Sequence, residues 1–94
     1  MKILVTYDII DTKIRNRLID ELFNFGFERL QYSIFLGEIN SKKFRKLVNS
    51  SEKIINKKED SLYFFSLCEE DFKRGIFLGK AINKKYIDCD ILYF

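Results

Sequence analysis

Asp8 is the acidic residue best placed to do chemistry, because it ends the first apolar segment of the chain, MKILVTYD. A carboxylate is a hard oxygen ligand that suits Mg²⁺, an ion that keeps several waters and needs few protein ligands. A metal ion held there would lower the pKa of an attacking water. Asp8 could equally serve only to cap the turn into the first helix, and the residue pattern leaves both roles open.

The chain contains no histidine, which excludes Ser-His-Asp and Cys-His catalysis. Any acid–base chemistry must therefore use Asp, Glu, Lys, Tyr, Cys or a metal-bound water. The two cysteines, Cys68 and Cys89, lie far apart and form no zinc-binding motif. We expect both to be unpaired, buried thiols.

Positive charge gathers in one segment. Residues 41–58 hold seven lysines and arginines against one glutamate, although the formal net charge of the chain is only +3. Such a segment favours a polyanionic partner, but a solvated lysine-rich helix face gives the same pattern. Arginine suits phosphate because its guanidinium can bind two oxygens, although Arg17 could instead pair with Asp20 or Glu21. The candidate nucleic-acid-binding residues are Arg15, Arg17, Arg29, Lys42, Lys43, Arg45 and Lys46.

The elements that position these residues begin with a strand at residues 2–8, where apolar side chains alternate between two faces. Apolar residues at positions 14, 18, 22 and 25 then form one stripe of an amphipathic helix. Asp11 or Thr12 is suited to begin this helix, and Gly26 is suited to end it. The pattern therefore predicts a strand followed closely by a helix, with Asp8 at the junction.

Two further strands and a second helix follow. Residues 27–39 are rich in β-branched and aromatic residues but too long for one strand, so we expect two strands joined near Tyr32–Ser33. The second helix begins after Asn40 or Ser41, and its apolar stripe leaves the lysines largely outside. Residues 61–67, SLYFFSL, predict a fourth strand.

This β-α-β-β-α-β order predicts an α+β, ferredoxin-like sandwich. The chain is long enough for a single domain over residues 1–94, with a core at 1–67 and a C-terminal tail at 68–94. The helices cover one face of the sheet, yet the strands are apolar on both faces. We therefore expect a homodimer through the open sheet face. Asp8 shares that face, so its two copies could approach each other.

The chain ends in four apolar residues that are unsuited to water. They could add a short strand to their own sheet, to the other protomer or to a partner protein. These candidate partner-binding residues are Ile91, Leu92, Tyr93 and Phe94.

The chain shows no sign of a membrane segment. No apolar run approaches the roughly 18 residues that span a bilayer. The N-terminal apolar run meets Asp8 before the core of a signal peptide could form. We expect a cytoplasmic protein with no membrane partner.

Several short motifs, taken in order, resemble one family. Tyr-Asp at residues 7–8 ends the first strand, QYSIF at 31–35 follows the first helix, GEI spans 37–39, and Glu-Asp-Ser at 59–61 leads into the last strand. This series resembles the small CRISPR-associated adaptation protein, the companion of the CRISPR integrase, over essentially the whole chain. Ile34 stands where that family commonly has valine, which is a conservative change.

The resemblance implies a ferredoxin-like homodimer that bridges integrase dimers, contacts double-stranded DNA and takes part in capturing new spacers. Members of the family are also described as magnesium-dependent nucleases, including endoribonucleases, so RNA is a possible second substrate. The family's key aspartate lies at the end of the first strand and maps onto Asp8. The resemblance thus implies Asp8 as the catalytic residue and metal ligand, and Mg²⁺ as the cofactor.

Three functions remain in view. The first is a DNA-binding scaffold that works with the CRISPR integrase, and the second is a metal-dependent nuclease centred on Asp8. A variant of the second is a toxin-like ribonuclease of the same fold that acts on messenger RNA. The third is a non-catalytic nucleic-acid-binding module that stacks bases on sheet aromatics, and it requires an open sheet face rather than a dimer.

Overall fold

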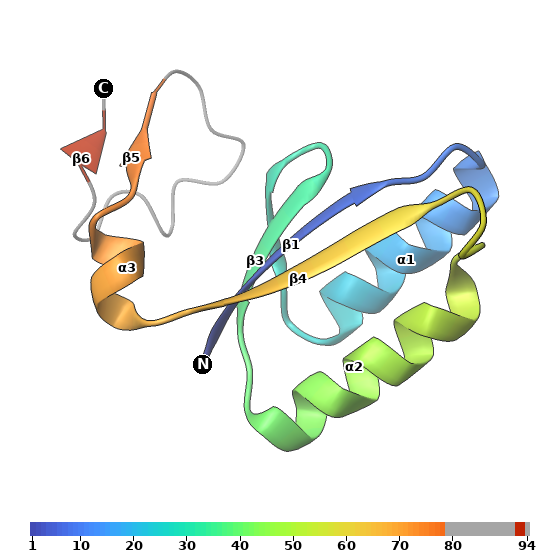
Figure 1. The fold of residues 1–94 in the computed structure, drawn as a ribbon, viewed down its shortest axis with the longest axis horizontal. Coiled ribbons are helices and arrows are strands. Elements are labelled where there is room, and N and C mark those ends of the chain that lie inside the picture. The colour runs from blue at the N-terminus through green and yellow to red at the C-terminus, as the bar shows by residue number, and fades with distance from the viewer. Residues whose placement is uncertain (79–91, 94) are drawn as a thin grey trace.

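The computed structural model describes residues 1–78 and 92–93, and it confirms the predicted order of the first six elements. A short helix and two short strands follow them (Figure 1). The elements are β1 (Lys2–Asp8), α1 (Thr12–Asn24), β2 (Glu28–Gln31), β3 (Ile34–Glu38), α2 (Ser41–Ile54), β4 (Ser61–Leu67), α3 (Glu69–Lys73), β5 (Ile76–Phe77) and β6 (Leu92–Tyr93).

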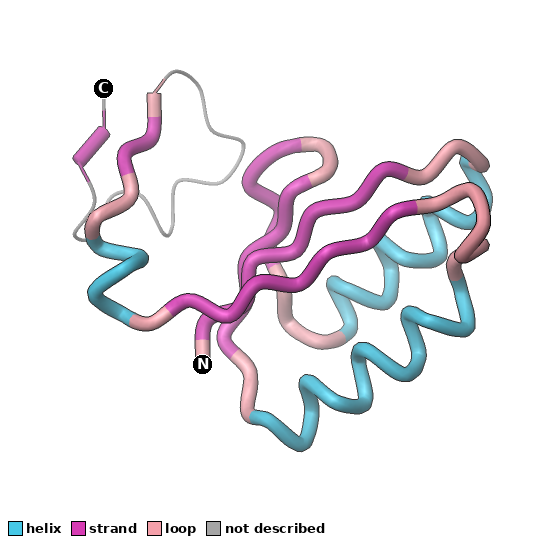
Figure 2. The backbone as a smooth tube through the Cα atoms, in the orientation of Figure 1, coloured by secondary structure: helices cyan, strands magenta, loops and turns pink. Residues whose placement is uncertain are grey.

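Four strands form one antiparallel sheet in the order β2-β3-β1-β4. Both long helices, α1 and α2, lie on the same side of this sheet (Figure 2). The order, with β1 and β3 central and the two helices in one layer, is that of the ferredoxin-like fold. The predicted α+β fold class is therefore confirmed.

The ends of the helices follow local sequence signals. The Asp11 carboxylate accepts hydrogen bonds from the backbone amides of Lys13 and Ile14, at 2.8 and 3.0 Å. The Asn40 side chain accepts one from the Lys43 amide at 2.8 Å. Gly26 adopts φ 86°, a left-handed conformation that favours glycine just after a helix. Each of these positions was among those expected from the sequence.

The core lies between the sheet and the two helices. From the sheet, Ile3, Val5 and Phe35 are completely buried, and they meet the buried apolar residues of α1 and α2. Gly37 of β3 faces the same layer, and a Cβ atom there would lie 2.6 Å from the ring of Phe27. Glycine at this position is what lets the buried Phe27 ring approach the strand so closely.

The opposite face of the sheet carries apolar side chains without helix cover. Tyr63 and Phe65 of β4 are 56% and 50% exposed, and their ring centroids are 6.4 Å apart. The register places Phe65 beside Leu4 of β1, and Leu4 lies opposite Leu36 of β3, which is completely buried. The prediction that the strands are apolar on both faces is therefore confirmed.

The segment after β4 contains a short helix that was not predicted from the sequence. Residues Glu69–Lys73 form α3, a short helix whose N-terminal amide at Asp71 donates to the Cys68 sulfur at 3.4 Å. Cys68 is a free thiol, as expected, but it is exposed, because it caps a surface helix instead of packing in the core. Cys89 lies outside the described residues.

The terminal strand does not join the four-stranded sheet. Leu92 and Tyr93 pair in parallel with Ile76 and Phe77, which gives a separate two-stranded sheet of β5 and β6. The possibility that the end of the chain extends its own main sheet is thus wrong for these two residues. The other two candidate partner-binding residues, Ile91 and Phe94, lie outside the described residues.

Among the residues that the structure describes, no helix is long and apolar enough to cross a membrane.

Candidate functional site

Asp8 is the last residue of β1 and lies on the open face of the sheet. It pairs with Ser61, the first residue of β4, and shares its face with Leu4 and Thr6. Its side chain is exposed and has no hydrogen bond or ion pair with the described residues. The alternation of β1 therefore leaves one exposed carboxylate at the end of the face that also carries Leu4 and Phe65.

The structure gives the helix-capping role to Asp11 instead. Arg15 further fixes the loop between β1 and α1, because its guanidinium donates to the Ile9 carbonyl at 2.9 Å and to the Thr12 hydroxyl at 3.1 Å. The turn after β1 is thus held without any contribution from the Asp8 side chain. This leaves the Asp8 carboxylate available for a ligand.

Within residues 1–78 and 92–93, no three Cys, Asp or Glu side chains come together as a metal site. One free carboxylate nevertheless fits Mg²⁺, which retains most of its waters and binds proteins through one or two carboxylates. A second carboxylate would have to come from another molecule.

The three candidate arginines outside α2 have different environments. Arg17 is exposed on α1 and forms no ion pair among the described residues, so the alternative pairing with Asp20 or Glu21 is not present. Arg15 is half-buried and already donates to the loop before α1. Arg29 is half-buried with its guanidinium 5.3 Å from the centre of the Phe35 ring. Of these three, Arg17 is therefore the most open to a phosphate.

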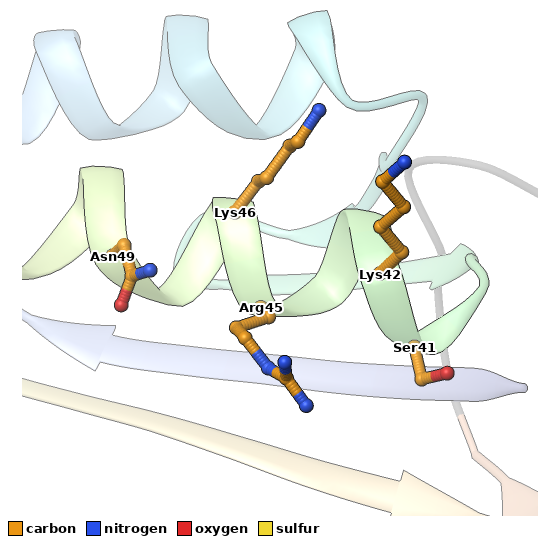
Figure 3. Close-up of a pocket in the computed structure, with 5 residues that line it drawn as sticks. All are labelled: Ser41, Lys42, Arg45, Lys46 and Asn49. Atoms are coloured by element: carbon orange, nitrogen blue, oxygen red, sulfur yellow. The ribbon is translucent and has the colours of Figure 1, made fainter.

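The four candidate cations of α2 form one surface. All are exposed, and none forms an ion pair with any residue that the structure describes. A pocket of about 390 Å³ opens along the helix, with Lys42 and Lys46 extending in one direction and Arg45 in another (Figure 3). The residues that line it are Ser41, Lys42, Arg45, Lys46 and Asn49.

Lys57, beyond the end of α2, behaves differently. Its ammonium lies 2.7 Å from the Glu52 carboxylate, so its charge is paired within the chain. The α2 cation surface, defined as Lys42, Lys43, Arg45 and Lys46, has no such pairing among the described residues. The sequence groups all of these cations together, whereas the structure separates paired from unpaired charge.

Lys2 is a charged residue whose role sequence reasoning missed. At the start of β1 its ammonium lies 2.9 Å from Glu69 and 3.2 Å from Glu38, and 5.1 Å from the centre of the Phe72 ring. The hydrogen bond with Glu69 raises the pKa of Lys2 against the opposing effect of burial. Burial by itself would raise the pKa of Glu38, but pairing with Lys2 lowers it below the ordinary value. This cluster ties α3 to the main sheet.

Tyr7 was also missed. Its hydroxyl donates a hydrogen bond of 2.8 Å to the backbone carbonyl of Tyr32, in the turn between β2 and β3. The two residues are 25 positions apart, and no local pattern indicates the contact. It fixes that turn beside the end of β1.

These features define a small ferredoxin-like protein with a free carboxylate at a sheet edge and an unpaired cationic helix face. The sequence matches the family described as CRISPR associated protein Cas2 over residues 1–74. This chain belongs to that family. The expected family resemblance is therefore confirmed.

Curated relatives carry related names. The chain is 30% identical over 83 residues to the CRISPR-associated endoribonuclease Cas2 of Desulforudis audaxviator, covering 88% of this chain and 74% of that protein. It is 38% identical over 78 residues to CRISPR-associated endoribonuclease Cas2 1 of Archaeoglobus fulgidus, covering 83% of each. The endoribonuclease activity in these names belongs to those relatives.

Solved structures agree on the fold. Streptococcus pyogenes Cas2 at pH 6.5 superimposes with a TM-score of 0.67 at 27% identity, covering 73% of this chain and 88% of that one. A hypothetical protein from Thermus thermophilus gives a TM-score of 0.68 at 24% identity, covering 71% and 80%. The second likeness supports the fold alone.

Proposed function

We propose that this protein acts in CRISPR adaptation as a homodimeric, nucleic-acid-binding scaffold for the CRISPR integrase, and that it cleaves phosphodiesters with Mg²⁺ at Asp8. The observation that carries the proposal is the open sheet face, where a free carboxylate shares one surface with exposed apolar side chains. Membership of the family and the endoribonuclease names of its relatives support the same function.

The dimer follows from the apolar surface. Two aromatic rings on a sheet face that is half open to solvent favour a second layer. The simplest second layer is another copy of the same face, because a twofold interface needs only a self-complementary surface. Since Asp8 lies on this face, the same association brings two carboxylates toward one another.

The chemistry then divides between two parts of the chain. Two Asp8 carboxylates would hold Mg²⁺, which supplies Lewis-acid activation of the phosphodiester and of a bound water when present. Asp8 has no competing partner among the described residues of its own chain, so it keeps its ligand oxygens available. The α2 cation surface binds backbone phosphates and positions the nucleic acid without reading its sequence.

Asp8→Asn is the direct test of cleavage. The substitution keeps size and shape but removes the charge that binds metal. We expect the parent protein to cleave RNA or DNA only with Mg²⁺, and the variant to lose that cleavage while remaining a dimer by light scattering. Asp11→Asn is the matched control, because asparagine also caps helices, and it should retain cleavage. Equal cleavage by the parent and Asp8→Asn would refute the nuclease assignment.

Binding to double-stranded DNA is tested by its salt dependence. Each cation that neutralises a phosphate contributes about 0.9 to the slope of log affinity against log salt. Substituting Lys42, Arg45 and Lys46 with alanine should therefore flatten the slope measured by fluorescence anisotropy. Lys57→Ala is the control, since that charge is already paired with Glu52. An unchanged slope in the triple variant would remove α2 from the DNA-binding surface.

The integrase contact is assigned to the end of the chain, residues 91–94, whose apolar side chains suit strand addition to a partner. Deleting these four residues should abolish co-purification with the integrase from the same cell while the dimer survives. Complex formation by the shortened chain at parent strength would contradict the assignment.

A monomeric RNA-binding module is the second candidate, because Tyr63 and Phe65 are exposed on the sheet and close to each other. Modules of this fold stack unpaired bases on such aromatics. Their use in a dimer interface would exclude this role. A monomer at micromolar concentration would favour the RNA-binding module over the scaffold.

A further inference from the structure

Tyr32 has the most exposed of the large apolar side chains recorded for the described residues, at 80%. It lies in the turn between β2 and β3 and forms none of the aromatic pairs seen among the described residues. A single exposed aromatic side chain is common on protein surfaces and carries no inference by itself. Its position relative to Asp8 distinguishes this one.

The pairing of β1 with β3 places Tyr32 at the edge of the sheet where Asp8 lies. Thr6 is opposite Ile34, and the amide of Tyr7 donates to the Ser33 carbonyl at 3.3 Å. The ladder of paired residues ends at Thr6 and Ile34, and Tyr32 and Ser33 form the turn that follows, next to the last residues of β1. Figure 1 shows the β2–β3 turn beside the end of β1.

The backbone of Tyr32 is anchored. Its carbonyl accepts the 2.8 Å hydrogen bond from the Tyr7 hydroxyl, and the Tyr7 ring is only 6% exposed. That ring also packs against the buried Phe35, with centroids 6.3 Å apart. The exposed ring of Tyr32 therefore extends from a backbone held by the core, which lowers the entropy lost when a ligand binds it.

We propose that the Tyr32 ring stacks on an unpaired base and so holds a single-stranded nucleic acid with its backbone near Asp8. The proposal rests on the proposed function in taking Asp8 as the cleavage site. An aromatic ring is a sequence-tolerant platform for a base, and such stacking strengthens binding by about tenfold. The bases of a duplex are stacked on one another, so Tyr32 selects single strands.

This role differs from that of the α2 cation surface. Phosphate contacts are equally available on single strands and duplexes, and they weaken as salt rises. Stacking on an uncharged ring depends little on salt and requires an unpaired base. The two surfaces therefore make different contributions: α2 supplies general affinity, and Tyr32 supplies the preference for single strands.

The test uses full-length Asp8→Asn protein, so that binding is measured without cleavage. Tyr32→Ala should weaken affinity for a single-stranded RNA or DNA oligonucleotide by about tenfold and leave duplex affinity unchanged. Tyr32→Phe should retain parent affinity, because its ring still stacks. A 2-aminopurine base in the single strand should be quenched by the parent and the Phe variant but not by the Ala variant.

Phe23→Ala is the matched control, because Phe23 is an aromatic residue of α1 that is 50% exposed and lies outside the turn. It should bind single strands as the parent does. Equal single-strand affinity in Tyr32→Ala, or an equal loss on duplex, would overturn the proposal. If Asp8→Asn cleaved as well as the parent but Tyr32→Ala still weakened single-strand binding, the nuclease assignment would be refuted. The stacking role of Tyr32 would then remain supported.

Discussion

The two faces of the sheet are built from the same kinds of side chain, but they have different surroundings. Phe64 and Phe65 are neighbours on β4, and they point to opposite faces. Phe64 packs edge-on against Phe44 of α2 with ring centroids 5.6 Å apart, whereas Phe65 is 50% exposed. One face therefore packs against the helices, and the other leaves aromatic side chains partly exposed.

The two faces therefore contribute differently to the folding free energy and to binding. On the helix-covered face, apolar burial supplies most of the folding free energy. On the open face, exposed rings and the Asp8 carboxylate contribute little to folding, so they are free to serve a partner or a ligand. Substitutions on the two faces should accordingly change different measured quantities.

Phe35→Ala should have the largest effect on stability. Phe35 is completely buried on the helix-covered face, and it contacts the rings of Tyr7 and Phe23. Removing a buried aromatic ring leaves a cavity and typically costs about 3–5 kcal/mol of unfolding free energy. Urea denaturation of the parent and the variant measures the loss. A change below about 1 kcal/mol, well short of the usual cavity cost, would mean that this face is not the principal core.

Gly37→Ala should have the next largest effect. The added Cβ would lie 2.6 Å from the ring of Phe27, a residue that is only 1% exposed. Overpacking of this kind costs about 1–3 kcal/mol. Gly26→Ala offers a comparison without crowding, because nothing lies within 4 Å of its Cβ and only its φ of 86° is strained. A melting temperature for Gly37→Ala equal to that of the parent would contradict the close approach of Phe27.

Much of the helix-covered architecture could be predicted because its signals are local. Asp11 and Asn40 are standard N-cap residues, Gly26 suits a helix end, and the division at Tyr32–Ser33 follows from strand length. Asp8 was placed on the open face by the alternation of β1 alone. These features need no knowledge of distant contacts.

The remaining features depend on contacts between residues far apart in the sequence. The register shift in β2 between Arg29 and Gln31 has no signal in a run of strand-forming residues. The helix α3 has only five residues and is capped by a cysteine sulfur, which is an uncommon cap. The contact of Tyr7 with Tyr32 joins separate elements. Such features appear only once the chain is folded.

Phe65→Ser should leave the fold nearly unchanged and weaken the dimer. The side chain already meets solvent, so its removal takes little burial from the monomer. In the proposed dimer it lies within the interface, where a polar residue would be buried. Sedimentation velocity should show a shift toward monomer. Phe64→Ser is the control on the other face. Its main effect should be a lower free energy of unfolding rather than a weaker dimer. A fully dimeric Phe65→Ser protein would place the interface elsewhere.

The smallest expected effect concerns the ion pairs of Lys2 with Glu38 and Glu69, at the start of β1. Glu38 and Glu69 are more than half exposed, so solvent screening keeps the contribution of each pair below about 1 kcal/mol. Because the folded pKa of Lys2 is raised, this contribution is present below its ordinary value of 10.5 and is lost as pH rises through the higher folded value. Because the folded pKa of Glu38 is lowered, its contribution is present above 4.5 and is lost as pH falls through the lower folded value.

Lys2→Met therefore should lower the unfolding free energy slightly and by a constant amount between these limits. The difference between parent and variant should shrink in more acidic solution and again in strongly alkaline solution. Urea denaturation at a series of pH values measures both. The same series on Phe35→Ala should show a large decrease without this dependence, since the phenyl ring carries no charge. A Lys2→Met difference that is independent of pH throughout would mean that the side chain contributes by packing against Phe72 rather than by charge.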